Sequence, residues 1–235
     1  MIGHNPDDQA GKKRMVPLRQ VRRVILLSLL LLLWSAPGCL PPPYRAHPEF
    51  ETRVKKINAL ALVPPVVKIY ELTPSGVVEL RDDWCAIGKA SLEDAFLEAF
   101  KARHYPIRPL RADAGVKEEM EQIRALFKLV NKSVQLHSYG PQVFPEKIGH
   151  FEYSLGSVER VVTACETDSI VFVFGFDQVS AQRPKTYVSV AVVDSSGTIL
   201  WYCVKGSRGE HELRDPISTA MLVEDILSSF PKRVE

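Results

Sequence analysis

The chain has 235 residues, of which 46% are hydrophobic and 25% are charged, a composition sufficient for one folded domain with a full-sized core. Of its 30 Lys and Arg residues, six lie in the first 23 positions, but only two of its 28 Asp and Glu residues do, so the chain from residue 39 onward has a formal charge of −2. A body without excess positive charge lacks the electrostatic footprint of nucleic-acid binding, and we exclude that class of function.

Residues 1–38 have the order of a signal peptide. Three arginines precede the uncharged run VILLSLLLLLW at 24–34, and the small or helix-breaking residues SAPG follow it. The run is too short for a membrane span, which needs about 20 apolar residues. An uncleaved anchor helix is the alternative interpretation. Residues 1–14 lengthen the basic region unusually, which makes Met15 an alternative start.

The four residues Ala36, Pro37, Gly38 and Cys39 resemble the bacterial lipobox, with alanine in place of the usual leucine. The resemblance implies that Cys39 is acylated and becomes the new N-terminus. The resemblance also implies that the protein is located in the outer membrane. The residue after the cysteine is Leu40, not the aspartate that retains such proteins in the inner membrane. We therefore expect a lipidated, proline-rich tether at 39–56, anchored in the membrane by acyl chains, and a globular periplasmic domain at 57–235.

Hydrophobic periodicity predicts strands and helices in alternation through the first half of this domain. In chain order they are a buried strand at 57–63 ended by Pro64 and Pro65, an extended segment at 66–72, an amphipathic helix at 84–103, a short strand at 104–110 and a helix at 116–137. The strand at 104–110 contains two prolines, which suit only a sheet edge. The apolar stripe of the last helix indicates packing on the core, with a short coiled coil as the alternative.

Residues 139–156 break this periodicity with prolines and glycines, and they carry four aromatic side chains, Tyr139, Phe144, Phe151 and Tyr153. Aromatic residues in such a loop either fold under the domain or await a partner. Folding under the domain is the more common outcome. We nevertheless take the four residues as the candidate contact with a protein partner.

The last third predicts a short helix at 157–165 capped by Ser157, a central strand at 169–176, and a hairpin of strands 186–193 and 198–204. Asp215 followed by Pro216 predicts the start of a final helix that reaches about Ser229. The fold class is therefore α/β in the mixed α+β sense. It is a single domain with a mixed β-sheet flanked by helices and a C-terminal hairpin and helix.

The segment VDSSGTILW, with Asp194, Gly197 and Trp201, resembles a hairpin of periplasmic lipoproteins with the fold of CsgG, LpoB and the N-terminal domain of TolB. Together with the order of elements, the resemblance covers roughly residues 57–230. It implies a non-enzymatic role in the assembly, secretion or regulation of an envelope complex. A pore is not expected, because the chain lacks paired alternating segments of about ten residues that would span a membrane.

The common catalytic and nucleotide-binding motifs are absent from the sequence, and we expect neither a cofactor nor a metal. Cys85, Cys165 and Cys203 allow one disulfide in three ways, or three buried thiols. The alternative function is a periplasmic Cys-dependent hydrolase, with a base among His104, His137, His150 and His211. We expect instead an outer-membrane-anchored periplasmic lipoprotein that binds an envelope protein partner.

Overall fold

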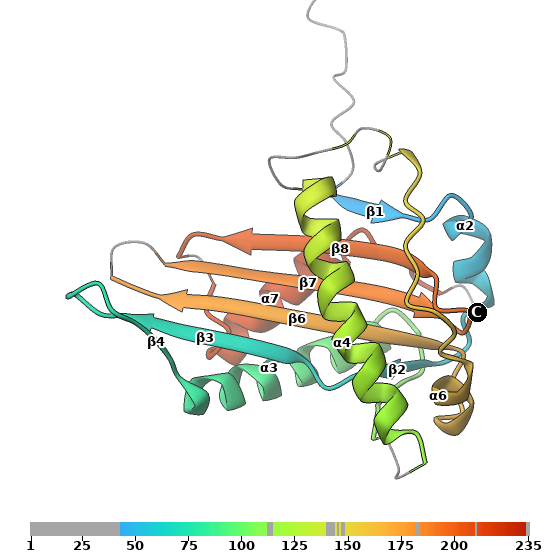
Figure 1. Cartoon of the computed structure of the whole chain (residues 1–235), viewed down its shortest axis with the longest axis horizontal. Helices are drawn as coiled ribbons and strands as arrows, with labels where there is room; N and C mark the ends of the chain where they lie inside the picture. The colour runs from blue at the N-terminus through green and yellow to red at the C-terminus, as the bar shows by residue number, and fades with distance from the viewer. Residues whose placement is uncertain are drawn as a thin grey trace, which may run out of the picture. The chain divides into compact units, whose positions relative to one another are not determined.

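The computed structural model describes residues 43–111, 115–139, 144, 146, 149–181, 184–209 and 211–233. The predicted signal peptide and Cys39 lie outside the described residues. The described chain folds into an eight-stranded mixed sheet with helices on both faces (Figure 1), which confirms the predicted mixed α+β class. Within the described residues, every helix is too short or too polar to cross a membrane.

The sheet is organised around β6, which pairs with strands on both of its sides. On one side, β6, β7, β8 and β1 follow one another in antiparallel order. On the other side, β2 and β3 both pair with β6 in parallel, β5 continues from β2, and β4 continues from β3. The bounds are β1 Tyr44–Ala46, β2 Leu60–Leu62, β3 Val66–Leu72, β4 Val78–Leu80, β5 Ile107–Pro109, β6 Ser169–Val179, β7 Lys185–Asp194 and β8 Ile199–Ser207.

Two prolines divide the edge of β6 between two partner strands. Leu60 of β2 is paired with Ser169, and Val66 of β3 is paired with Phe174. Pro64 and Pro65 stand between these strands, and a proline has no N–H with which to continue a ladder. The predicted end of the first strand at Pro64 is therefore confirmed, and the predicted second segment is β3.

The helices form a layer on each face of the sheet, so that β6 faces two cores. Val171 and Val173 of β6 belong to the core under α3 and α7, whereas Ile170 and Phe172 belong to the core under α4. Each such side chain stabilises the fold by about 1.5–3 kcal/mol when it is fully buried. The helix bounds are α2 Phe50–Arg53, α3 Asp82–Lys101, α4 Lys117–Val134, α6 Glu159–Ala164 and α7 Pro216–Leu227.

The predicted N-terminal cap of the final helix is present. The Asp215 side chain accepts hydrogen bonds from the backbone N–H groups of Ile217 and Ser218 at 3.3 and 3.0 Å, and Pro216 occupies the first turn of α7. Ser157 behaves differently from its predicted role. It lies one residue before the N-cap Val158 of α6, where its hydroxyl accepts from Glu159 N at 3.3 Å.

The folded domain begins at Tyr44, whereas the sequence suggested a tether as far as residue 56. Strand β1 pairs with β8, and α2 continues into the short 3₁₀ turn Val54–Lys56. Phe50 and Val54 are both buried, and the Phe50 ring lies 6.0 Å from that of Phe230. These two apolar residues stand alone among charged ones, so their single helical turn gave no periodic signal in the sequence.

The hairpin between β7 and β8 forms where it was predicted. Asp194 Oδ1 accepts hydrogen bonds from the N–H groups of Ser196 and Thr198, both at 3.1 Å. Gly197 has φ +83°, a left-handed conformation that glycine adopts without strain. Trp201 is fully buried, and its ring lies 5.1 Å from the ring of Phe230.

Buried Asp177 holds the segment before α7 against the end of the sheet. Its Oδ2 accepts from Leu213 N at 3.1 Å, and its Oδ1 lies 3.0 Å from Thr186 Oγ1, which donates to the His211 carbonyl at 2.6 Å. The Thr186 hydroxyl has one proton, so at any moment it donates either to the Asp177 carboxyl or to the His211 carbonyl. Burial raises the pKa of Asp177, against the lowering effect of the hydrogen bonds from Leu213 and Thr186.

Two glycines with similar backbone conformations offer a matched test of the hairpin packing. A Cβ atom on Gly197 would lie 1.7 Å from the Gly156 carbonyl oxygen, whereas one on Gly76 (φ +85°) would meet no atom within 4 Å. We expect Gly76→Ala to lower the free energy of unfolding by about 1 kcal/mol through backbone strain alone. Gly197→Ala should cost more than about 3 kcal/mol, because the backbone of 154–156 must also move. Urea denaturation measures both free energies of unfolding. Equal losses for Gly76→Ala and Gly197→Ala would contradict the close contact between Gly197 and Gly156.

The raised pKa of Asp177 predicts a pH-dependent contribution to stability. A carboxyl whose folded pKa exceeds the ordinary value of about 3.9 binds more protons in the folded state, so stability falls as pH rises from that value through the folded pKa. The free energy of unfolding of the wild type, relative to Asp177→Asn, should fall over this interval in urea titrations from pH 4 to 8. Asp94→Asn, on the exposed face of α3, serves as the control. A relative stability that rises with pH would contradict the assignment.

Candidate functional site

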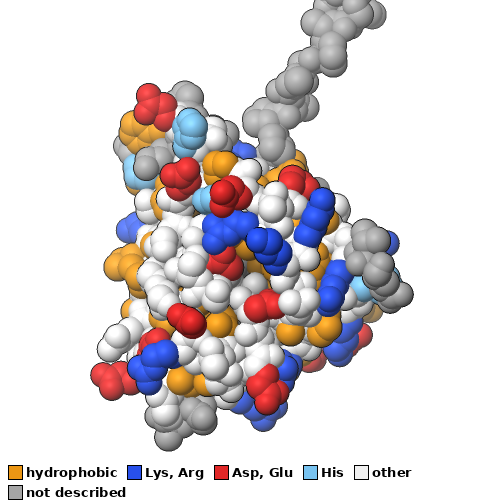
Figure 2. Space-filling model, turned by 90° about the vertical axis from the view of Figure 1, so that its right-hand side faces the viewer, with side chains coloured by type: hydrophobic (Ala, Val, Ile, Leu, Met, Phe, Trp, Pro, Cys, Tyr) orange, Lys and Arg blue, Asp and Glu red, His pale blue; other side chains and the backbone are white. Residues whose placement is uncertain are grey.

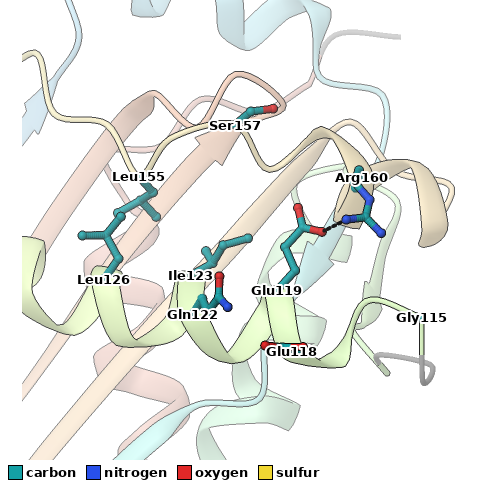
Figure 3. Close-up of a pocket in the computed structure, with 9 residues that line it drawn as sticks. All are labelled: Gly115, Glu118, Glu119, Gln122, Ile123, Leu126, Leu155, Ser157 and Arg160. Carbon is teal, nitrogen blue, oxygen red and sulfur yellow. Dashed lines mark ion pairs between the residues drawn. The ribbon is translucent and has the colours of Figure 1, made fainter.

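A hollow of about 630 Å³ lies between α4 and the segment 155–160. Polar side chains from both elements line it, and the apolar residues Ile123, Leu126 and Leu155 line its inner part. In Figure 3, Leu126 and Leu155 point toward one another, and Glu119 points across the hollow toward Arg160. The remaining lining residues are Gly115, Glu118, Gln122 and Ser157.

An ion pair separates this hollow from a second one. Arg160 Nη1 lies 3.1 Å from Glu119 Oε2, and both residues line the adjoining hollow of about 570 Å³. The Arg160 side chain is 74% exposed and that of Glu119 is 25% exposed, so solvent screens the pair and it contributes little to stability. With Glu118 and Glu159 nearby, acidic groups outnumber the single arginine, and the two hollows suit a cationic or hydrogen-bond-donating group.

Helix α4, which forms one wall of the hollow, is held on the sheet by a buried polar cluster. Asn131 Oδ1 accepts from the Tyr202 hydroxyl at 2.6 Å and from Ser189 Oγ at 2.9 Å. Burial raises the pKa of Tyr202, so its hydroxyl remains a donor. Next to this cluster, the Phe127 ring stacks on Phe172 at 4.6 Å. Together these contacts fix how α4 crosses the sheet.

The structure separates the four aromatic residues that were predicted to contact a partner. Phe151 is 1% exposed in the core beneath α4, and Tyr139 is half-buried with its hydroxyl 3.2 Å from the Tyr202 carbonyl. Tyr153 is half-buried, with its ring 5.1 Å from that of Phe151. Phe144, by contrast, is 52% exposed. Of the four rings, Phe151 is therefore part of the core and Phe144 is the one most exposed to solvent.

The three cysteines of the domain are free thiols, so none of the three possible disulfide pairings is formed; Cys203 is buried, and Cys85 and Cys165 are partly buried. Cys203 is buried in β8, and burial raises its pKa to about 12. Cys85 Sγ accepts from the Ile69 N–H at 3.1 Å. The residues described include no group of three or more His, Cys, Asp or Glu that could hold a metal ion.

The histidines proposed as bases for the hydrolase have other neighbours. The ring of His137 lies 5.2 Å from that of Phe144, and His211 Nδ1 lies 3.3 Å from the Ser218 hydroxyl. His104 and His150 are exposed, the former at the end of α3 with φ 65°. A buried thiol with a raised pKa stays protonated at neutral pH and so is a poor nucleophile, which makes Cys203 unsuited to nucleophilic catalysis.

The sequence did not reveal a row of half-buried aromatic side chains on the α4 side of the sheet. The Phe176 ring stacks on Tyr187 of β7 at 4.9 Å and lies 5.7 Å from Tyr70 of β3. In Figure 1, the C-terminal ends of β3 and β6 extend beyond α4 on this face. The continuous apolar run of β6 suggested burial on both faces, and the strand register is needed to bring these rings together.

Charges of both signs are mixed across the end of the molecule near the C-terminus. Figure 2 shows Lys and Arg side chains interspersed with Asp and Glu on this face. Two of them form an ion pair, Arg53 from α2 with Asp194 of the hairpin. A mixed surface of this kind does not provide the single-sign field that holds a phosphate backbone.

The burial difference between Phe151 and Phe144 predicts different effects of the same substitution. Phe151→Ala should lower the free energy of unfolding by about 3–5 kcal/mol because it leaves a cavity in the core. Phe144→Ala, at an exposed position, should change it by less than about 0.5 kcal/mol. Chemical denaturation of the two variants measures this difference. A large loss for Phe144→Ala would show that this ring also packs on the domain.

No protein-family model and no curated protein matches the chain. Among solved structures, it is similar to the PelC dodecamer from Paraburkholderia phytofirmans, with a TM-score of 0.38 and 12% identity over 76% of this chain and 91% of that one. It is also similar to lipoprotein GNA1162 from Neisseria meningitidis, with a TM-score of 0.34 and 16% identity over 74% of this chain and 99% of that one. A third similar structure is the LpoB C-terminal domain from Salmonella enterica, with a TM-score of 0.25 and 9% identity over 69% of this chain and 95% of that one. All three TM-scores are below 0.5, so we base no functional argument on these likenesses.

Proposed function

We propose that this protein is a lipid-anchored protein of the bacterial envelope whose domain binds a protein partner. The observation that carries the proposal is the order of basic residues, short apolar run, small residues and Cys39 at the start of the chain. A run of this length suits a cleaved signal better than a membrane span. Leu40, next to the acylated cysteine, favours the outer membrane over the inner one.

The early start of the folded domain limits the length of the tether. Four residues, Leu40 and prolines 41–43, separate Cys39 from Tyr44, the first residue of β1, so the chain makes five steps between them. An extended chain advances at most about 3.3–3.6 Å per residue, so the edge of the sheet formed by β1 lies within about 17 Å of an acylated Cys39. Prolines 41–43 favour an extended conformation of this short tether. A tether of this length would hold the domain close to the membrane.

Binding without catalysis is supported by the chemistry of the described residues. Cys203 is a buried thiol with a raised pKa, and the hollow beside α4 presents carboxylates and an arginine. Such groups suit the recognition of a polar, cationic surface on a partner. Assembly, secretion and regulation of an envelope complex all require recognition of this kind. A cysteine hydrolase would need a thiol whose alkylation stops an activity.

Metabolic labelling with a palmitate analogue tests the anchor. The full chain, expressed in a Gram-negative host, should carry the label and sediment with the outer membrane. Cys39→Ser should lose the label and leave the outer-membrane fraction, whereas the control Cys165→Ser should keep both properties. A label that persists on Cys39→Ser would overturn the proposed acylation site. Membrane attachment without any label would indicate an uncleaved anchor helix.

A further inference from the structure

A second cleft, of about 690 Å³, lies between α3 and α7 on the face of the sheet opposite to α4. Figure 1 shows these two helices side by side behind the sheet. The cleft is lined mainly by small side chains, so a partner's backbone can approach closely. These small residues are Ala90, Ser91, Ala95, Ala99, Ala102 and Ala220.

Long apolar side chains border this cleft and are exposed to solvent. Ile87, which lines the cleft on α3, is 49% exposed. On α7, Ile217 and Met221 are 73% and 62% exposed; they do not line the cleft but follow directly after its lining residues Pro216 and Ala220, one helical turn apart. Single exposed apolar residues are ordinary on a protein surface, but a group of them beside a cleft marks a binding surface.

The rims of the cleft are acidic. Asp94 and Glu98 lie one turn apart on α3, and Glu224 lies on α7. The Glu98 and Glu224 side chains are 75% and 55% exposed, although Glu98 lies 2.8 Å from Lys101 and Glu224 lies 3.0 Å from Arg103. Three carboxylates on the rims thus stand against two cations, so the occupant meets a floor of small side chains between rims that keep a net charge of −1.

We infer that this cleft is the docking site for an amphipathic helix of the partner protein, whose apolar stripe is flanked by Lys or Arg. A helix laid between two helices buries a stripe of side chains at i, i+3, i+4 and i+7, and the cleft between α3 and α7, with its small-residue lining, can receive such a stripe. This inference deepens the proposed function, on which it rests.

Charge decides between the occupants of such a cleft. A second copy of this chain, packed through the same surface, would bring the acidic rims of both copies together, and like charges in an interface are unfavourable. An anionic membrane surface would also repel these rims. Basic side chains on the occupant complement them, and they would also steer its approach.

Two synthetic helical peptides of about 18 residues, or five turns, serve as probes. Both carry the same Leu and Ala stripe, flanked by Lys in one peptide and by Glu in the other. Fluorescence anisotropy with the full chain carrying Cys39→Ser should show binding of the Lys peptide and binding of the Glu peptide that is weaker by about tenfold or more. Equal binding of both peptides, or binding of neither, would overturn the inference.

Substitutions in the cleft locate the binding. Ala220→Trp fills the cleft from an exposed position and should weaken binding of the Lys peptide by about tenfold or more, whereas the control Ala125→Trp on exposed α4 should not. The double variant Asp94→Lys with Glu98→Lys should shift the preference toward the Glu peptide. Sedimentation of a dimer that Ala220→Trp dissociates would show instead that a second copy occupies the cleft. Binding of the peptides does not depend on the acyl chain. Failure of the labelling experiment at Cys39 would therefore overturn the proposed anchor without overturning the docking site.

Discussion

Strand β6 must bury side chains on both of its faces at once, and the arrangement of the whole domain follows from that constraint. Its alternate residues enter two different cores, and its two edges take three strands, β7, β2 and β3. A strand that is apolar on both sides needs a helix layer on each side of the sheet. The layers α3 with α7 and α4 with α6 satisfy this need, and each layer offers a separate surface to solvent.

The two surfaces differ in chemistry because the two layers are held in different ways. Helix α4 is fixed by hydrogen bonds at Asn131 as well as by packing, and beside it lies a polar hollow with an ion pair. Helices α3 and α7 pack through apolar side chains and leave a cleft with a floor of alanines. The two faces of the domain therefore present different chemistry to solvent.

The sequence predicted those elements whose local signals agree with their tertiary environment. The Asp215 and Pro216 cap, the Asp194 to Gly197 turn and the periodic helices were recognised because a few adjacent residues determine them. It did not predict β1, α2 or β4, because their few apolar residues alternate with charged ones and belong to no longer apolar run, unlike those of the equally short β2. The α3–α7 cleft and the row of rings at Tyr70, Phe176 and Tyr187 were not predictable either, since each depends on contacts between distant segments.

The sheet ends in short strands at each edge that the structure describes. Strands β1, β4 and β5 have three residues each, whereas the central strands β6, β7 and β8 have eleven, ten and nine. A short edge offers few unpaired N–H and C=O groups, and the prolines beside β5 reduce them further. The three short strands therefore offer little template for strand addition, and among the described residues the longer edge that remains open is the end of β8 beyond Cys203, where β1 no longer pairs with it.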